Sequence, residues 1–212
     1  MSKTLNYSGE IYRKSLHLLA LAYPVGYSIL GKSVALWVLV PLSLAMIGAD
    51  FLRSKNEWTH GLIDRIFGFM MRPEERVFDP RRPVVNGATW VTTSFTVLIL
   101  FFSGPIAILS FAIFMIGDAM AALVGRKWGA HPWGSGSRSM EGTLAFMISG
   151  LVVAHALGSE SIPFSFFQFN SVSLIGAVLV AGVLEALPLP VNDNLIAPVG
   201  AALFLLGMGA FL

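Results

Sequence analysis

The sequence predicts an all-α fold, a polytopic integral membrane helical bundle that forms a single membrane domain over residues 1–212. Hydrophobic residues make up 55% of the chain and charged residues 12%, about half the charged share of an average soluble domain. The 21 Gly and 11 Pro also fit, because membrane helices contain more of both than soluble helices do. This composition excludes a water-soluble protein of this length and argues against nucleic-acid binding. Because the chain has no Cys, disulfides and thiolate metal sites are excluded as well.

About seven apolar runs approach the length needed to span a membrane, since a helix needs about 20 residues to cross a hydrocarbon core of ~30 Å. Short polar or Gly/Pro-containing segments separate them. The predicted transmembrane helices are Ile11–Leu30, Val34–Leu52, Gly87–Phe102, Pro105–Val124, Gly142–Leu157, Val172–Leu187 and Leu195–Leu212.

The polar segment 53–85 is expected to be cytoplasmic and to contain one interfacial amphipathic helix, Asn56–Met70. At 100° per residue, Trp58 and Leu62 fall on one half of this helix and Asp64 on the other. Such a helix lies in the plane of the membrane surface. It serves either as an anchor or as a lip over which a lipid enters the protein.

The basic residues predict the orientation. With seven spans, alternate loops share a side, and 13 of the 14 Lys and Arg residues fall on the side of the N-terminus. Lys32 is the remaining one. Because cytoplasmic loops carry the excess of basic residues, the N-terminus is predicted in the cytoplasm and the C-terminus on the opposite side.

Acidic residues within or at the ends of apolar runs are informative, because an ionised group in the bilayer costs a few kcal/mol or more. These residues are Asp50, Asp118, Glu141, Glu185 and Asp193. On the predicted topology all five lie at or near the cytoplasmic side, which indicates one aqueous site there. The alternative is that each one caps a helix or pairs with a nearby Arg; Asp193 and Asn194 are suitable N-caps.

The loop 125–141 has the composition of an anion-binding site. Gly and Ser residues let backbone amides approach a phosphate at a helix N-terminus, and nearby Arg and Lys side chains neutralise it. The predicted nucleotide-binding residues are Gly125, Arg126, Lys127, Ser137, Arg138, Ser139, Gly142 and Thr143. Asp118 and Glu141 bracket the loop and could hold Mg²⁺. No G-x-x-x-x-G-K-[ST] motif occurs, which excludes a P-loop kinase, whereas a flexible loop without ligand remains an alternative.

The run G-D-A-M-A-A-L-V-G-R-K-W-G from Gly117, followed by S-R-S-M-E-G-T-L-A from Ser137, resembles the signature of the membrane-embedded CTP-dependent lipid kinases. That family includes dolichol, phytol and yeast-type diacylglycerol kinases and is related to the phosphatidate cytidylyltransferases. Further family-like pieces are Arg13-Lys14-Ser15-Leu16-His17, Asn86-Gly87-Ala88-Thr89-Trp90, Glu185-Ala186-Leu187 and Asp193-Asn194-Leu195-Ile196-Ala197-Pro198. The chain departs from the pattern at Arg138, where the family usually has Lys, and in the loop 130–136, which is not basic.

The resemblance implies transfer of the γ-phosphoryl group of CTP to the hydroxyl of a lipid alcohol, with Mg²⁺ as cofactor. It implies catalytic and metal-binding roles for Asp118, Glu141 and Asp193. Substrate-binding or supporting roles fall to Arg13, Lys14, His17, Asp50, Asn86, Glu185 and Asn194. Asp118, Asp193 and Glu185 are all candidates for the general base. We expect Asp118→Asn to abolish turnover while leaving the fold near normal.

The partners implied are CTP, a membrane lipid alcohol and the bilayer, and a homodimer is compatible with the sequence. Polyprenol, a phytol-like isoprenoid alcohol and diacylglycerol all fit as acceptors. One alternative is a phosphatidate cytidylyltransferase that makes a CDP-lipid from CTP. A transporter is a second alternative, disfavoured because the acids are confined to one side whereas an ion path needs polar groups through the full depth.

Overall fold

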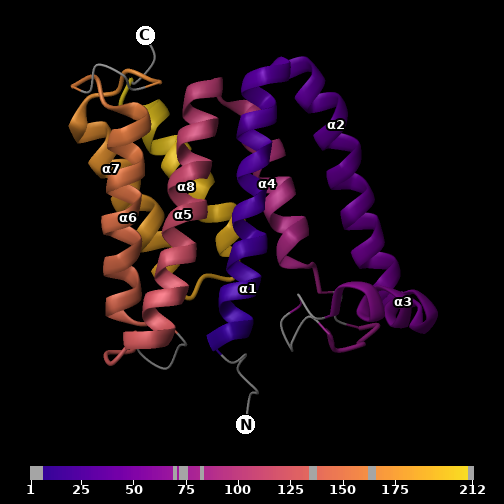
Figure 1. Cartoon of the computed structure of the whole chain (residues 1–212). Coiled ribbons are helices and arrows are strands. Elements are labelled where there is room, and N and C mark those ends of the chain that lie inside the picture. The colour runs from indigo at the N-terminus through magenta and orange to yellow at the C-terminus, as the bar shows by residue number, and fades with distance from the viewer. Residues whose placement is uncertain are drawn as a thin grey trace.

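The computed structural model describes residues 7–68, 71, 76–81, 84–133, 138–161 and 166–209, and within these ranges the chain is a bundle of helices (Figure 1). The predicted all-α class is confirmed. The elements in chain order are α1 (Tyr7–Leu18), the 3-10 turn η1 (Leu19–Leu21), α2 (Ala22–Lys55), α3 (Glu57–Phe67), α4 (Gly87–Phe101), α5 (Gly104–Trp128), α6 (Met140–Gly158), α7 (Ser171–Ala186) and α8 (Asp193–Gly207).

Each predicted apolar run corresponds to a helical segment. Among the described residues, three helical stretches are long and apolar enough to cross a membrane, namely Glu10–Lys55, Gly104–Trp128 and Met140–Gly158. The helices α4, α7 and α8 are apolar but shorter. The predicted last run extends to Leu212, but α8 ends at Gly207 and residues 210–212 lie outside the described part of the chain.

The stretch Glu10–Lys55 holds the first two predicted runs, because the chain reverses direction within α2 (Figure 1). Gly31 makes this turn with φ 80° and ψ 169° inside an otherwise helical segment. A residue with a Cβ rarely adopts that conformation. The predicted separator Gly31-Lys32-Ser33 is therefore a tight turn that returns α2 alongside α4, with Ser43 Oγ 2.8 Å from Thr96 Oγ1.

Substituting Gly31 tests this turn. A Cβ added at Gly31 or at Gly48 would meet no atom within 4 Å, so the two positions differ in backbone conformation and not in packing. We expect Gly31→Ala to lower the free energy of unfolding by about 1–3 kcal/mol. Gly48→Ala, in a regular part of α2, should raise that free energy by roughly 0.5–1 kcal/mol. Thermal unfolding in detergent, followed by circular dichroism, measures both; equal stability of the two variants would contradict the left-handed turn.

Helix α5 is the central element of the bundle and contacts α1, α4, α6, α7 and α8. In its most apolar window 67% of residues are buried, compared with 22% for α6. Gly117, Ala121 and Gly125 follow one another at four-residue spacing and face α6: a Cβ at Gly117 would lie 2.8 Å from the Phe146 ring. Small residues at this spacing let two helices approach closely. Part of the glycine pattern in the sequence thus serves helix packing.

Large apolar side chains also cover the outside of the bundle. Trp37 of α2 is 81% exposed and Phe101 of α4 is 75% exposed. Further exposed residues of this kind lie on α6, α7 and α8, among them Leu144, Val172 and Leu203. Apolar surface of this extent is typical of contact with lipid or another apolar partner. Together with the long apolar helices, it is the surface of a multi-pass membrane protein.

The predicted amphipathic helix is present as α3, at the foot of α2 (Figure 1). Asn56 caps it by accepting hydrogen bonds from the backbone amides of Trp58 and Thr59. Arg76 donates to Asp64 at 2.6 and 2.8 Å, and these hydrogen bonds hold the pKa of Asp64 below its ordinary value. The predicted end of this helix at Met70 lies outside the described residues.

Candidate functional site

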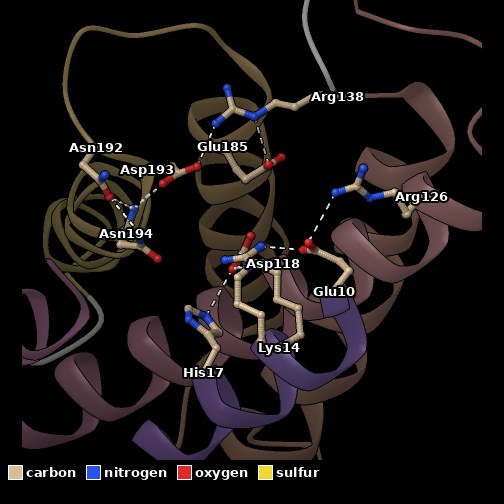
Figure 2. Close-up of polar contacts among 11 residues, drawn as sticks. Glu10, Lys14, His17, Asp118, Arg126, Arg138, Glu185, Asn192, Asp193 and Asn194 are labelled. Atoms are coloured by element: carbon tan, nitrogen blue, oxygen red, sulfur yellow. Dashed lines mark hydrogen bonds and ion pairs between the residues drawn. The ribbon is translucent and has the colours of Figure 1, made fainter. Parts of the chain in front are cut away.

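Polar side chains from distant parts of the sequence meet at one end of the bundle, where α1 begins, α5 and α7 end and α8 begins (Figure 2). Several of them are buried, although charged groups are rarely buried unless they are paired. The buried charged and amide side chains in this region are Glu10, Lys14, Asp118, Glu185 and Asn194. The convergence expected from the distribution of acids is therefore present, except for two residues discussed below.

The centre of the site is the contact between α1 and Asp118 of α5. Lys14 donates a hydrogen bond from Nζ to Asp118 Oδ2, and His17 Nε2 lies 3.1 Å from the same oxygen. Lys14 is 2% exposed and Asp118 is 8% exposed. A buried charge without a partner would be strongly destabilising, so the lysine and the aspartate depend on each other. The contact joins the R-K-x-x-H pattern of the first helix to the G-D pair of the fifth.

A second ion-pair group lies beside this contact. Glu10 accepts from Arg13 at 2.5 Å and lies 3.4 Å from Arg126 Nη2. Glu10 is itself only 4% exposed. Glu10 was not among the site residues predicted from the sequence. Its position three residues before Arg13, which places both side chains on one helix face, could have indicated the ion pair. Arg126, a predicted phosphate ligand, is thus held by an acid. Lys127 instead lies over the ring of Trp128, 4.5 Å from its centroid.

Arg138 connects α7 and α8. Its Nε donates to Glu185 at 3.2 Å, its Nη2 to Asp193 at 2.8 Å and its Nη1 to the carbonyl oxygen of Leu187 at 2.9 Å. The planar guanidinium makes these contacts from three nitrogen atoms in a fixed fork, whereas a Lys ammonium would have to donate all three hydrogen bonds from a single nitrogen. The departure from the usual Lys at this position therefore comes with a specific three-way contact.

Asn192 caps α8 and was missed by the sequence analysis, which considered Asp193 and Asn194 as caps. Asn192 Oδ1 accepts from the backbone amide of Asn194 at 3.0 Å and from its side-chain amide at 2.8 Å. Asp193 Oδ1 accepts from the same backbone amide at 2.9 Å, and its other oxygen, Oδ2, accepts from Arg138. Asn194 is fixed by its cap and is 9% exposed.

The start of α6 packs closely against α5. Ser139 Oγ accepts from the amide of Gly142 at 3.1 Å, and Gly142 packs against Gly125 of α5, with an added Cβ lying 3.4 Å from the Gly125 Cα. The structure therefore places Gly125, Ser139 and Gly142 at a helix contact. Ser137 lies outside the described residues.

Glu141 and Thr143 face the loop after α5 and not the Lys14–Asp118 contact. Glu141 Oε1 lies 2.6 Å from His131 Nδ1, and Trp133 donates from Nε1 to Thr143 Oγ1 at 2.9 Å. The side chain of His131 is 74% exposed. The structure thus does not bring Glu141 into contact with Asp118 or Asp193.

Asp50 and Asn86 form a contact between α2 and the start of α4. Asp50 Oδ2 accepts from the Asn86 amide at 2.9 Å and from Thr89 Oγ1 at 2.6 Å, and Arg53 lies 3.4 Å from its other oxygen. Asn86 in turn caps α4 through the amide of Ala88. Asp50 therefore positions Asn86 and has no contact with the acids around Arg138 among those recorded for the described residues.

The described carboxylates do not gather into a metal-binding cluster. Within the described ranges, no group of three or more His, Asp and Glu side chains could hold a metal ion. Mg²⁺ at nucleotide sites needs only one or two carboxylates, with phosphate oxygens and water as its other ligands. Glu185 and Asp193 both contact Arg138, whereas Asp118 contacts Lys14 and His17. Carboxylate oxygens are the type of ligand that Mg²⁺ prefers.

Comparison with known proteins gives an uncharacterized relative and relatives named as lipid kinases. An uncharacterized protein of Rickettsia prowazekii is 26% identical over 202 residues, which is 95% of either chain. Dolichol kinase of Saccharomyces cerevisiae is 30% identical over 83 residues, or 39% of this chain and 16% of the kinase. CTP-dependent diacylglycerol kinase 1 of the same yeast is 25% identical over 188 residues, or 80% of this chain and 62% of that protein.

The resemblance to CTP-dependent lipid kinases inferred from the motifs is confirmed by these homologues, at moderate identity. The matched regions cover less than two thirds of either named kinase. No protein-family model matches the chain. No solved structure matches it either.

Proposed function

We propose that this chain, whose homologues include proteins named as CTP-dependent lipid kinases, is a membrane kinase that transfers the γ-phosphoryl group of CTP to a lipid alcohol. The observation that carries the proposal is the buried contact of Lys14 and His17 with Asp118. It joins two family-like motifs 104 positions apart at a point where arginines and further carboxylates also meet. Such a site suits phosphoryl transfer, which depends mainly on positioning and charge neutralisation.

The proposal includes seven membrane passes, with the N-terminus and the site on the cytoplasmic side and the C-terminus on the other. Figure 1 supports an odd number of passes, since α1 begins and α8 ends at opposite ends of the bundle. The sidedness of Lys and Arg supports the orientation. In this arrangement α3 lies in the interface at the cytoplasmic surface.

The reaction forms a bond between the lipid oxygen and the γ-phosphorus and breaks the bond from that phosphorus to the oxygen of CDP, which leaves. The hydroxyl proton passes to a carboxylate, for which Asp118, Asp193 and Glu185 remain candidates. Arg126 and Arg138 exchange their present carboxylate partners for phosphate oxygens. Mg²⁺ neutralises phosphate charge when bound. Asp118 and Asp193 would hold it, and Glu141 would join them only after leaving His131.

Labelled CTP tests the activity. Purified protein in lipid nanodiscs, given Mg²⁺ and a panel of isoprenoid alcohols, diacylglycerol and phosphatidic acid, should transfer label from γ-labelled CTP to a lipid alcohol. It should transfer none from α-labelled CTP, because the cytidine monophosphate part stays in the released CDP. Label from α-labelled CTP on phosphatidic acid would establish a cytidylyltransferase instead. Absence of both products, with ion flux through reconstituted vesicles, would overturn the enzyme proposal in favour of a transporter.

A further inference from the structure

A cavity of about 250 Å³ lies between α1, α4 and the start of α8. One wall of the cavity is a single face of the N-terminal helix, since the lining residues on that helix recur every three or four positions. The opposite wall is the first turns of α4, around Ala88 and Val91. Leu19, which is 68% exposed, and the exposed Ala88 both line it. The cavity therefore reaches the apolar outer surface of the bundle.

The cavity is polar at one end and apolar at the other. The polar lining groups at the site end of the bundle are Arg13, His17, Asn86, Asn192 and Asn194. Apolar lining groups follow further along the same helices and include Leu19, Ala20 and Val91. Beyond them, Tyr23 lies within hydrogen-bond distance of Thr92, with 2.9 Å between the two hydroxyl oxygens, which joins the two walls at that level.

We propose that this cavity binds the acceptor as a single-chain lipid alcohol, an inference that rests on the proposed kinase function. The hydroxyl lies at the polar end and the hydrocarbon chain along the apolar walls, entering sideways past Leu19 and Ala88. His17 connects the cavity to the site, because it lines the cavity and its Nε2 lies 3.1 Å from Asp118. The hydroxyl is thus one side chain away from Asp118.

The charges of the lining favour a neutral headgroup. Among the described residues that line the cavity, Arg13 is the permanently charged one, and its guanidinium already pairs with Glu10 at 2.5 Å. An anionic headgroup such as that of a phosphatidic acid would need an unengaged cation to offset its burial. The amides of Asn86 and Asn194 can instead donate to or accept from an uncharged hydroxyl. The cavity volume of about 250 Å³ lies just below the range of about 300–1,000 Å³ typical of ligand pockets, which favours one hydrocarbon chain over two.

Photolabelling tests the site independently of turnover. The full-length protein in nanodiscs is irradiated without nucleotide in the presence of an isoprenoid alcohol that carries a diazirine on its chain. Labelled peptides should map to residues 13–23 and 87–91. Ala88→Trp fills the mouth of the cavity and should lower labelling at least about tenfold, raise the KM for the alcohol and leave the KM for CTP unchanged. Ala88→Leu should have a smaller effect.

The control is Ala156→Trp, which places the same side chain at an exposed position of α6. It should change neither the labelling nor either KM, and circular dichroism should show both tryptophan variants folded. Label on other helices, or unchanged labelling of Ala88→Trp, overturns the site. Equal labelling of the same peptides by a diazirine diacylglycerol overturns the single-chain acceptor. If the protein phosphorylates the alcohol but the label maps to other helices, the kinase proposal stands and the cavity is not the acceptor site. If the label maps to the cavity but no alcohol is phosphorylated, the kinase proposal is overturned and binding of the alcohol in the cavity stands.

Discussion

Asp118→Asn is expected to lower the turnover of lipid alcohol by at least about 10²–10³-fold, because it removes a charge aimed at the site where phosphate charge changes. The sequence also predicted that this variant would fold almost normally, and the structure changes that expectation. Lys14 is 2% exposed and pairs with Asp118. Removing one partner of a buried ion pair costs about 3–5 kcal/mol. The single variant should therefore also unfold at a lower temperature.

The double variant Lys14→Met/Asp118→Asn separates the two effects. The double variant leaves neither charge of this pair buried without its partner, so it should recover most of the thermal stability in detergent but not the turnover. Asp64→Asn is the matched control, since Asp64 pairs with the exposed Arg76 and such surface pairs contribute about 0–1 kcal/mol. Wild-type turnover in the double variant would remove Asp118 from the chemistry. A double variant no more stable than the single one would contradict the buried pair.

Arg138→Ala is expected to lower kcat/KM for CTP by about 10²–10³-fold, because it removes a cation that we propose binds phosphate. It also leaves Glu185 and Asp193 without the guanidinium that both contact. Arg138→Lys keeps the charge but loses the three-nitrogen fork that reaches both carboxylates and the Leu187 carbonyl, so we expect a loss of about tenfold. Steady-state kinetics with γ-labelled CTP measures both variants.

Arg81→Ala is the matched control, because Arg81 is exposed and makes no side-chain contact recorded at the site. It should leave kcat/KM for CTP unchanged. Equal losses in Arg138→Ala and Arg138→Lys would show that geometry and not charge is needed. An unchanged KM and kcat in Arg138→Ala would exclude Arg138 from nucleotide binding.

The helices could be predicted from the sequence because their signals are local. The apolar runs predicted the positions of the long helices, and the separator at Gly31 predicted the turn within α2. The amphipathic pattern predicted α3. Convergence of the acids at one end was also predictable in part, since span topology fixes the side of each loop. These predictions needed only the order of segments along the chain and not their packing.

The partners of the site residues could not be predicted, because they depend on which helix faces meet. Glu10 and Arg126 are 116 positions apart, and no spacing rule relates them. Gly125 and Gly142 fit a phosphate loop and a close helix contact equally well in sequence, and the structure places them in the contact. Glu141 looked like a site acid from its position before an apolar run, yet it bonds His131 of the neighbouring loop.

The paired charges around the site affect which anions can enter. Arg126 and Arg138 are each held by carboxylates, and Lys14 by Asp118. A small anion such as inorganic phosphate can replace one such contact, but it would then leave the displaced carboxylate without a cation to pair with. On the proposed function, a triphosphate that brings its own Mg²⁺ would replace several of these contacts in one binding event, because its linked phosphates act at high effective concentration. The carboxylates that now hold Arg126 and Arg138 would then compete with the phosphate oxygens for the two guanidinium groups.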